Sequence, residues 1–312
     1  MKKMILLSGI LLFGEVLAAA YPPVTVDVSI EQVSEHAYYA PGAAGTATEN
    51  EGFISNAGFV VTDAGVVVFD SLGSPSLAWA LRQRIREITD KPVVKVVVSH
   101  YHADHIYGLQ VFKDEGAQIL APRGAYEYLD SAVSAERLEE RRLSLAPWVN
   151  DDTRLVRPDL MIEELHQFSL GGIDFQLNYL GSAHSDGDLT MYVVQDRVLF
   201  SGDIIFESRV PFVGDADTKR WLETLEALET DGLVALVPGH GPAASDPVGA
   251  VSRTREYIAY LRGVMGSAVE NLDDFAKAYD AADWSRFENL PAFDAANRRN
   301  AYQVFLSMEA EA

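Results

Sequence analysis

The segment VVKVVVSHYHADH, residues 93–105, decides the fold, because an apolar run ends directly in three histidines and an aspartate. Residues 93–98 are mostly valine, which is typical of a strand that is buried on both faces. His100 and His102 are two residues apart at the end of this strand, so both rings are predicted to point the same way. The strand end therefore presents two imidazoles to one side of the sheet.

The cluster continues into a short helix, which is predicted to begin around Asp104 and to run through Phe112. Asp104 and His105 lie where the chain turns into this helix, so they can face the opposite side of a small cavity. Four ligand-type side chains within six residues can serve two metal ions. Imidazole and carboxylate ligands suit Zn²⁺ and the neighbouring transition metals, so iron or manganese also fits.

Three further segments place one ligand-type side chain each after a predicted apolar strand. The strands cover residues 173–180, 198–200 and 233–237, and the segments after them are GSAH, SGD and PGHG. Each segment carries a glycine, which lets the backbone bend or approach closely. The predicted metal ligands are His100, His102, Asp104, His105, His184, Asp203 and His240. His36 and His166 have no such companions, and we interpret them as structural residues.

The strands fall into two groups, each followed by helices. Residues 58–62 and 66–69 form a predicted hairpin, and Ser74-Pro75 is a typical helix start. The second strand group covers residues 160–201, and the chain after Pro247 is helical in pattern. This order predicts an α/β sandwich of two sheets with helices outside, divided near residues 150–160.

Residues 100–105, together with His184, Asp203 and His240, resemble the metallo-β-lactamase fold superfamily over about residues 30–245. The resemblance implies an αββα four-layer sandwich with the site at one edge between the sheets. It assigns His100, His102 and His184 to a first metal ion, Asp104, His105 and His240 to a second, and Asp203 to a position between them. Asp70, after the apolar run 66–69, matches a position near the site that contacts the ligands rather than the metal.

Four short and less specific stretches are similar to the branch of quinoprotein-relay zinc metallohydrolases, also called SoxH-like. They are residues 55–59, 184–189, 206–211 and 297–300. The branch implies an exported hydrolase associated with a periplasmic oxidation system. We expect one hydrolase domain at residues 21–245 and a helical extension at residues 246–312 that packs on it.

The expected reaction is hydrolysis of an ester, thioester, lactone or similar bond of a small molecule. Two divalent ions lower the pKa of a shared water from about 15.7 toward 7, so hydroxide is available as the nucleophile at neutral pH. Asp104 can orient the hydroxide and accept its proton, and no Gly-x-Ser-x-Gly motif supplies a serine nucleophile instead. Candidate substrate contacts are Tyr101, Phe206, Arg209 and Phe212.

Three other functions fit parts of the pattern. Persulfide dioxygenases resemble the same motif but use one iron on a subset of the ligands. A β-lactamase is a second alternative, against which Asp203 argues, because such members generally carry Cys or Ser at that position. A non-catalytic periplasmic metal-binding accessory protein is the third, and the complete ligand set argues against it.

The N-terminus and the charge predict where the protein works. Residues 1–20 combine Lys2 and Lys3, a short apolar run and an Ala-rich end, which is typical of a signal peptide. We therefore expect a periplasmic or secreted protein without a membrane span. The chain has no cysteine, which excludes disulfides and thiolate ligands. Removal of residues 1–20 changes the formal charge from −21 to −22, and so acidic a surface disfavours nucleic acid and anionic membranes.

Overall fold

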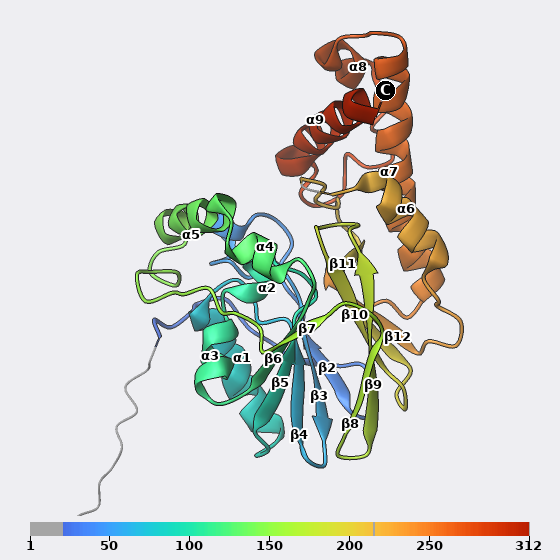
Figure 1. The fold of residues 1–312 in the computed structure, drawn as a ribbon. Helices are drawn as coiled ribbons and strands as arrows, with labels where there is room; N and C mark the ends of the chain where they lie inside the picture. Colours follow the sequence, from blue (N-terminus) through green and yellow to red (C-terminus); the bar gives the residue numbers. More distant parts are fainter. Residues whose placement is uncertain (1–20, 215, 312) are drawn as a thin grey trace, which may run out of the picture.

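A computed structural model describes residues 21–214 and 216–311, so the predicted signal peptide lies outside the described residues. Two β-sheets pack face to face, with helices on the outer face of each, which gives the predicted αββα sandwich (Figure 1). No helix in the described part of the chain has the length and apolar content that crossing a bilayer requires.

The first sheet has the order β1-β2-β3-β4-β5-β6-β7. Pairing is antiparallel from β1 to β4 and parallel from β4 to β7. Its strands are β1 (Glu31–Gln32), β2 (Ala37–Ala40), β3 (Ala57–Thr62), β4 (Gly65–Phe69), β5 (Val93–Val97), β6 (Gln118–Pro122) and β7 (Leu160–Ile162). The hairpin predicted at residues 58–69 is confirmed as β3 and β4.

The second sheet has the order β12-β11-β10-β9-β8, with only the β11–β12 pair parallel. Its strands are β8 (His166–Leu170), β9 (Ile173–Gly181), β10 (Asp188–Val193), β11 (Val198–Phe206) and β12 (Ala235–His240). The boundary between the sheets lies after β7, at residues 163–165, rather than at the predicted 150–160. The cause is the short strand β7, which adds to β6 and keeps residues 160–162 in the first sheet.

Apolar side chains from both sheets meet in the middle layer. Val67 and Val97 from the first sheet are fully buried in one cluster with Leu177, Met191 and Phe200 from the second. Burying such side chains contributes roughly 1.5–3 kcal/mol each before conformational entropy is subtracted. This layer fixes the two sheets against each other, so their strand ends form a common edge.

Helices cover the outer faces. The longer ones are α1 (Pro75–Ile88), α5 (Ala132–Ser144), α6 (Thr218–Ala227), α7 (Pro247–Glu270) and α9 (Phe293–Glu311). The shorter ones are η1 (Ala47–Glu49), α2 (Ala103–Ile106), α3 (Leu109–Asp114), α4 (Ala125–Leu129) and α8 (Phe275–Ala281). In Figure 1, α1 and α3 lie beside the first sheet, α6 and α7 lie beside the second, and α8 and α9 stand beyond its end.

The single helix predicted from Asp104 to Phe112 is wrong, because the chain forms α2 and α3 instead. The backbone carbonyl of His105 accepts hydrogen bonds from the Ser71 N–H and hydroxyl, both at 2.8 Å, and so does not continue the helix. At Gly108 a Cβ atom would lie 1.9 Å from the Ser71 carbonyl oxygen. The break therefore results from the close approach of the loop after β4, which also carries Asp70.

Candidate metal centre

The seven predicted ligands come from four separate segments of the chain and meet at one edge of the sandwich. His100 and His102 follow β5, and Asp104 and His105 lie in α2. The other three are His184 after β9, Asp203 in β11 and His240 at the end of β12. The ligand atoms of His100, His102, His184 and Asp203 all lie within 4.8 Å of one another, as do those of Asp104, His105 and His240.

The first set surrounds a small volume lined by three ring nitrogens. His102 Nδ1 lies 3.0 Å from His100 Nε2 and 3.0 Å from His184 Nε2. Asp203 Oδ2 closes the set at 3.3 Å from His184 Nε2 and 3.9 Å from His100 Nε2. Ligand atoms roughly 2.0–2.1 Å from a tetrahedral zinc would lie about 3.3–3.4 Å apart, so these spacings fit a metal ion.

The second set shares Asp203 with the first. Asp203 Oδ1 lies 3.2 Å from His105 Nε2, and Asp203 Oδ2 lies 3.3 Å from His240 Nε2. Asp104 Oδ2 lies 3.2 Å from His240 Nε2 and 3.6 Å from His105 Nε2. The carboxylate of Asp203 therefore stands between the two groups of histidines.

Buried atoms without hydrogen-bond partners show that this cluster is not a saturated polar network. His105 Nε2 and Asp203 Oδ1 are both buried and, although they lie 3.2 Å apart, neither has a hydrogen-bond partner, whereas buried polar groups are ordinarily satisfied. Each of these atoms faces other ligand-type atoms, and a cation between them would satisfy both. The residues present thus fit a metal site by donor type, spacing and unmet bonding capacity.

Hydrogen bonds to the far ring nitrogens hold His100, His105 and His240 in place. His105 Nδ1 lies 2.8 Å from Asp70 Oδ2, and His240 Nδ1 lies 2.6 Å from the Ile54 carbonyl oxygen. The Ser99 hydroxyl donates to Asp70 and lies 2.8 Å from His100 Nδ1. Such contacts fix the tautomer so that the other nitrogen is free for a metal. The sequence suggested Asp70 for this place, whereas Ser99 and the Ile54 carbonyl were missed.

The β-strands that carry Asp203 and His240 are longer than predicted, because β11 extends to Phe206 and β12 to His240. Both ligands therefore lie within strands rather than after them. Pairing between β11 and β12 shifts register between Phe200 and Gly202 and again before Phe206. Gly239 makes this approach feasible, because a Cβ atom there would lie 1.9 Å from Asp203 Oδ1.

The electrostatics of the first set favour the protonation states that bind metals. Burial would raise the pKa of Asp203, but His240, His105 and His184 hold it well below its usual range. Burial lowers the pKa of His184 to about 3. Burial and the neighbouring His105 and His102 hold the pKa of His100 well below its usual range. An ionised carboxylate and neutral imidazoles are the forms that coordinate a cation.

The carboxylates have the opposite effect on the second set, where a cation would have to displace the protons that they favour on His105 and His240. Burial would lower the pKa of His240, but Asp203 and Asp104 raise it. Burial would lower the pKa of His105, but Asp203, Asp104 and Asp70 raise it well above its usual range.

Burial raises the pKa of Asp188 to about 7. Asp188 accepts hydrogen bonds from the backbone N–H groups of Ala183 and Ser185, so it holds the loop that presents His184. The sequence showed Asp188 only as part of a motif and gave it no role.

A cavity of about 180 Å³ opens above the cluster. Phe206, Arg209 and Phe212 line it, as does Asp104, and the Phe206 ring stacks on His240 with 5.1 Å between ring centroids. Tyr101 is not part of its lining. The Tyr101 ring lines a neighbouring hollow, and its hydroxyl donates to the Val156 carbonyl oxygen at 3.2 Å, so this side chain is used in packing.

His36 and His166 lie outside the metal-binding cluster. His36 contacts Asp196, and the His166 ring packs near Phe168 on β8.

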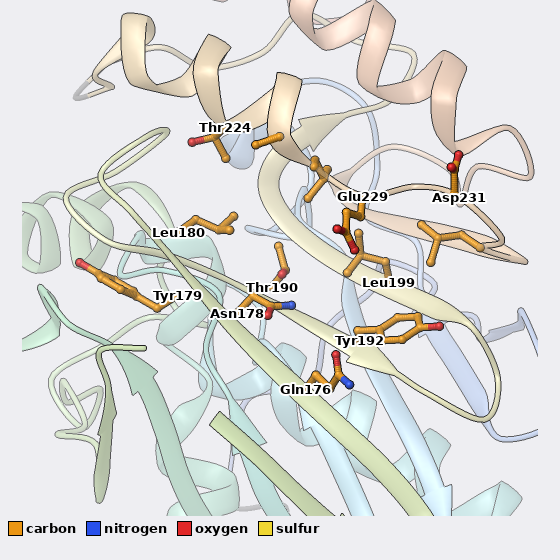
Figure 2. Close-up of a pocket in the computed structure, with 13 residues that line it drawn as sticks. Gln176, Asn178, Tyr179, Leu180, Thr190, Tyr192, Leu199, Thr224, Glu229 and Asp231 are labelled. Carbon is orange, nitrogen blue, oxygen red and sulfur yellow. The ribbon is translucent and has the colours of Figure 1, made fainter. Parts of the chain in front are cut away.

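A larger hollow, of about 620 Å³, lies on the outer face of the second sheet beside the end of α6. Figure 2 shows polar side chains there, among them Gln176, Asn178 and Thr190 from β9 and β10. Glu229 and Asp231 are the acidic groups among its described lining residues, and no histidine is among them. The hollow therefore lacks converging ligand-type groups, and we place the function at the His/Asp cluster.

Fold and site together define an α/β sandwich hydrolase with a His/Asp cluster that can bind metal. A sequence model of the metallo-β-lactamase superfamily matches residues 50–240, which is more than half of the chain. The chain belongs to the metallo-β-lactamase superfamily of hydrolases.

Metallo-β-lactamases and alkylsulfatases are both among the proteins to which the chain is similar. The metallo-β-lactamase type 2 of Bacteroides fragilis is 24% identical over 247 residues, which cover 77% of this chain and 90% of that protein. The metallo-β-lactamase of Pontibacter korlensis has a similar structure, with a TM-score of 0.59 and 20% identity over 75% of this chain and 99% of that one.

Two alkylsulfatases are among these proteins as well. The linear primary-alkylsulfatase of a Pseudomonas strain is 24% identical over 233 residues, 63% of this chain and 44% of that protein. The structure of the inverting sec-alkylsulfatase Pisa1 from Pseudomonas sp. matches 90% of this chain and 50% of its own, with a TM-score of 0.71 and 20% identity. The chain thus spans about half the length of these alkylsulfatases.

Proposed function

We propose that this protein hydrolyses an ester, thioester, lactone or similar bond of a small molecule at a centre of two divalent metal ions, with zinc as the expected metal. The observation that carries the proposal is the position of Asp203 between two groups of ligand-type side chains. Its Oδ1 faces His105 at 3.2 Å, and its Oδ2 faces both His184 and His240 at 3.3 Å.

The chain's own residues have distinct tasks in this proposal. His100, His102 and His184 would hold one ion, Asp104, His105 and His240 the other, and Asp203 would contact both. A bound metal pair would supply a nucleophile at neutral pH and polarise the substrate oxygen. Asp104 is the most exposed carboxylate of the cluster, with a side chain 23% exposed against 4% for Asp203. It therefore faces the cavity, where it can orient the nucleophile and accept its proton.

A second candidate is hydrolysis of an alkyl sulfate ester. It is supported by the similarity to Pisa1, which extends over 90% of this chain and so must include part of the chain after residue 245. The Pontibacter korlensis β-lactamase matches 75% of the chain. At least part of the region after residue 245 is therefore a feature that this chain and the alkylsulfatase share.

We further propose export to the periplasm or the medium, on the basis of the charged and apolar pattern of residues 1–20. Membership of the quinoprotein-relay branch remains a proposal that rests on the four short motifs. Both are independent of the chemistry at the cluster.

The test is an activity screen of purified, metal-loaded protein with an acyl ester, a thioester, a lactone, a β-lactam and an alkyl sulfate. We expect hydrolysis of at least one of the ester, thioester or lactone substrates. This activity should be lost when a chelator is added, return with Zn²⁺ and be absent in His102→Ala. Hydrolysis of the β-lactam alone would assign the protein to the lactamases. Oxygen uptake with a persulfide and no hydrolysis would contradict the proposal and favour a mononuclear iron dioxygenase.

A further inference from the structure

Four arginines surround the cavity above the metal-binding cluster. Arg137 and Arg141 lie one turn apart on α5, Arg209 follows β11, and Arg299 lies on α9. We refer to these four residues as the arginine rim. The protein as a whole has a formal charge of −21, so a concentration of positive charge at one cavity is a local feature. A cleft lined by one sign of charge raises the local concentration of ligands of the opposite sign.

Arg209 is largely buried, and the carboxylates of Asp203 and Asp104 attract its guanidinium without forming an ion pair with it. One of its terminal nitrogens lies 3.2 Å from His240 Nδ1. That ring nitrogen already lies 2.6 Å from the Ile54 carbonyl oxygen, to which it must donate a proton. Two donors then face each other, so His240 does not satisfy Arg209. The Arg209 Nε atom is also buried without a partner.

No carboxylate in residues 21–214 and 216–311 lies within 4.0 Å of the Arg209 or Arg299 guanidinium nitrogens. Arg298, the neighbour of Arg299, behaves differently, because it pairs with Asp280 at 3.1 Å. Since buried donors are ordinarily satisfied, the unmet capacity of Arg209 indicates a ligand that brings its own acceptor oxygens.

Arg299 is held at the cavity by the C-terminal helix. Its guanidinium carbon lies 5.5 Å from the centroid of the Phe212 ring, which also lines the cavity. The next residue, Asn300, is fully buried, accepts from the Val213 N–H at 3.1 Å and donates to the Pro211 carbonyl oxygen at 2.7 Å. Helix α9 and the loop at residues 211–213 are thus fixed together as one wall of the cavity.

Arg137 and Arg141 complete the opposite wall. Their acidic neighbour is Glu140, at 3.8 Å from Arg137 and 3.5 Å from Arg141, with a side chain that is 49% exposed. An exposed pair at this distance contributes little and leaves both guanidinium groups available to a ligand.

We propose that the substrate of this site carries an anionic oxygen group, such as a carboxylate or sulfate, and that Arg209 binds this group while Arg137, Arg141 and Arg299 attract it to the cavity. This inference rests on the proposed hydrolase function and adds the class of substrate. Guanidinium groups suit the task because they bind carboxylate and sulfate oxygens through two parallel hydrogen bonds.

The test uses two acyl esters that release the same chromophore, neutral 4-nitrophenyl butyrate and anionic mono-4-nitrophenyl adipate, with 4-nitrophenyl sulfate as a third arm. We expect the metal-loaded protein to prefer an anionic substrate over the butyrate. Arg209→Gln should lower kcat/KM for that substrate by about 10- to 100-fold, and by a larger factor than for the butyrate. Preference for the adipate identifies a carboxylate, and preference for the sulfate identifies a sulfate ester.

The matched control is Arg298→Gln, which removes the same charge from the next position on α9 and should change neither rate. Arg299→Gln should lower the rate with the anionic ester, and this effect should weaken as salt is raised. A preference for the butyrate, or equal losses in Arg298→Gln and Arg299→Gln, would overturn the inference.

A binding measurement separates this inference from the proposed function. Calorimetric titration of the metal-loaded protein with adipate and with sulfate needs no turnover. Binding that is weakened in Arg209→Gln supports the arginine site even if no ester is hydrolysed. Binding that is absent, or unchanged in Arg209→Gln, contradicts it.

Discussion

Two histidine–aspartate contacts of this molecule have the same length and different consequences. His105 Nδ1 lies 2.8 Å from Asp70, and His36 Nδ1 lies 2.8 Å from Asp196. The His105 side chain is fully buried and its Nε2 has no hydrogen-bond partner but faces carboxylate oxygens of Asp203 and Asp104, whereas the His36 side chain is 32% exposed. A histidine–aspartate contact alone therefore does not identify a site. The unmet second nitrogen, surrounded by other ligand atoms, does.

The structural pair has its own task. Asp196 also accepts from the His36 N–H at 2.8 Å, and it lies in the turn between β10 and β11. His36 immediately precedes β2, so this contact links the first sheet to the second. The comparison predicts that changes at one pair affect metal binding and that changes at the other affect only stability.

The largest effect is expected from loss of a ligand. Asp203→Ala and His102→Ala should each lose metal and lower kcat/KM by more than about 100-fold. Loss of a residue that only hydrogen-bonds to a metal ligand already lowers metal affinity or activity by up to about 100-fold. Metal content by elemental mass spectrometry and rates on the best substrate measure this, with circular dichroism to show that the fold survives. Full metal content with normal turnover in either variant would show that the ligand assignment is wrong.

Asp70→Asn should lower metal affinity by about 10- to 100-fold. The Asp70 carboxylate accepts from the Ser99 N–H and hydroxyl and contacts His105, so an amide would turn an N–H toward groups that donate. Competition with a chelator of known affinity gives the constant. Asp196→Asn is the matched control, and equal metal affinities in the two variants would remove the distinction between the pairs.

Asn300→Ala tests buried polar contacts that do not serve metal binding. Loss of this side chain leaves the Val213 N–H and the Pro211 carbonyl oxygen without their partner. The free energy of unfolding should fall by about 1–3 kcal/mol. Denaturant unfolding measures this loss, and metal content should be unchanged. A loss of metal would mean that the wall built on α9 also holds the ligands.

The smallest effect concerns Asp196 and depends on pH. Although burial acts in the opposite direction, hydrogen bonds from Ser34 and His36 lower the pKa of Asp196. A carboxyl with a lowered pKa in the folded state stabilises the protein above its unfolded pKa, near 3.9, and this contribution is lost as the pH falls below it. The difference in unfolding free energy between wild type and Asp196→Asn should therefore be constant near neutral pH and shrink below about pH 4. A difference that grows on acidification would contradict this sign.

The fold was predictable where local pattern and tertiary structure agree. The valine-rich run at residues 93–98, the hairpin before it and the helix start at Ser74 each appear in the structure, with the Ser74 hydroxyl accepting from the Leu77 N–H at 3.1 Å. The single helix expected through Phe112 does not form, because Ser71, which is distant in the sequence, donates a hydrogen bond to the His105 carbonyl oxygen. Local periodicity carries no information on such a tertiary contact.

The candidate site was also predictable only in part. The seven residues that the structure brings together were predicted as a group because each has ligand chemistry and stands near a strand end. Ser99 and the Ile54 carbonyl were not, because a serine and a backbone oxygen have no distinctive pattern. The arginine rim was missed except for Arg209, since α5 and α9 meet at the cavity only through the fold.

The most direct test of a two-metal centre is the metal content per chain of protein purified without added metal, measured by elemental mass spectrometry. We expect close to two divalent ions per chain, mainly zinc, and a lower number in Asp203→Ala. One iron per chain, unchanged when zinc is offered, would contradict the two-metal centre on which the proposed hydrolysis depends.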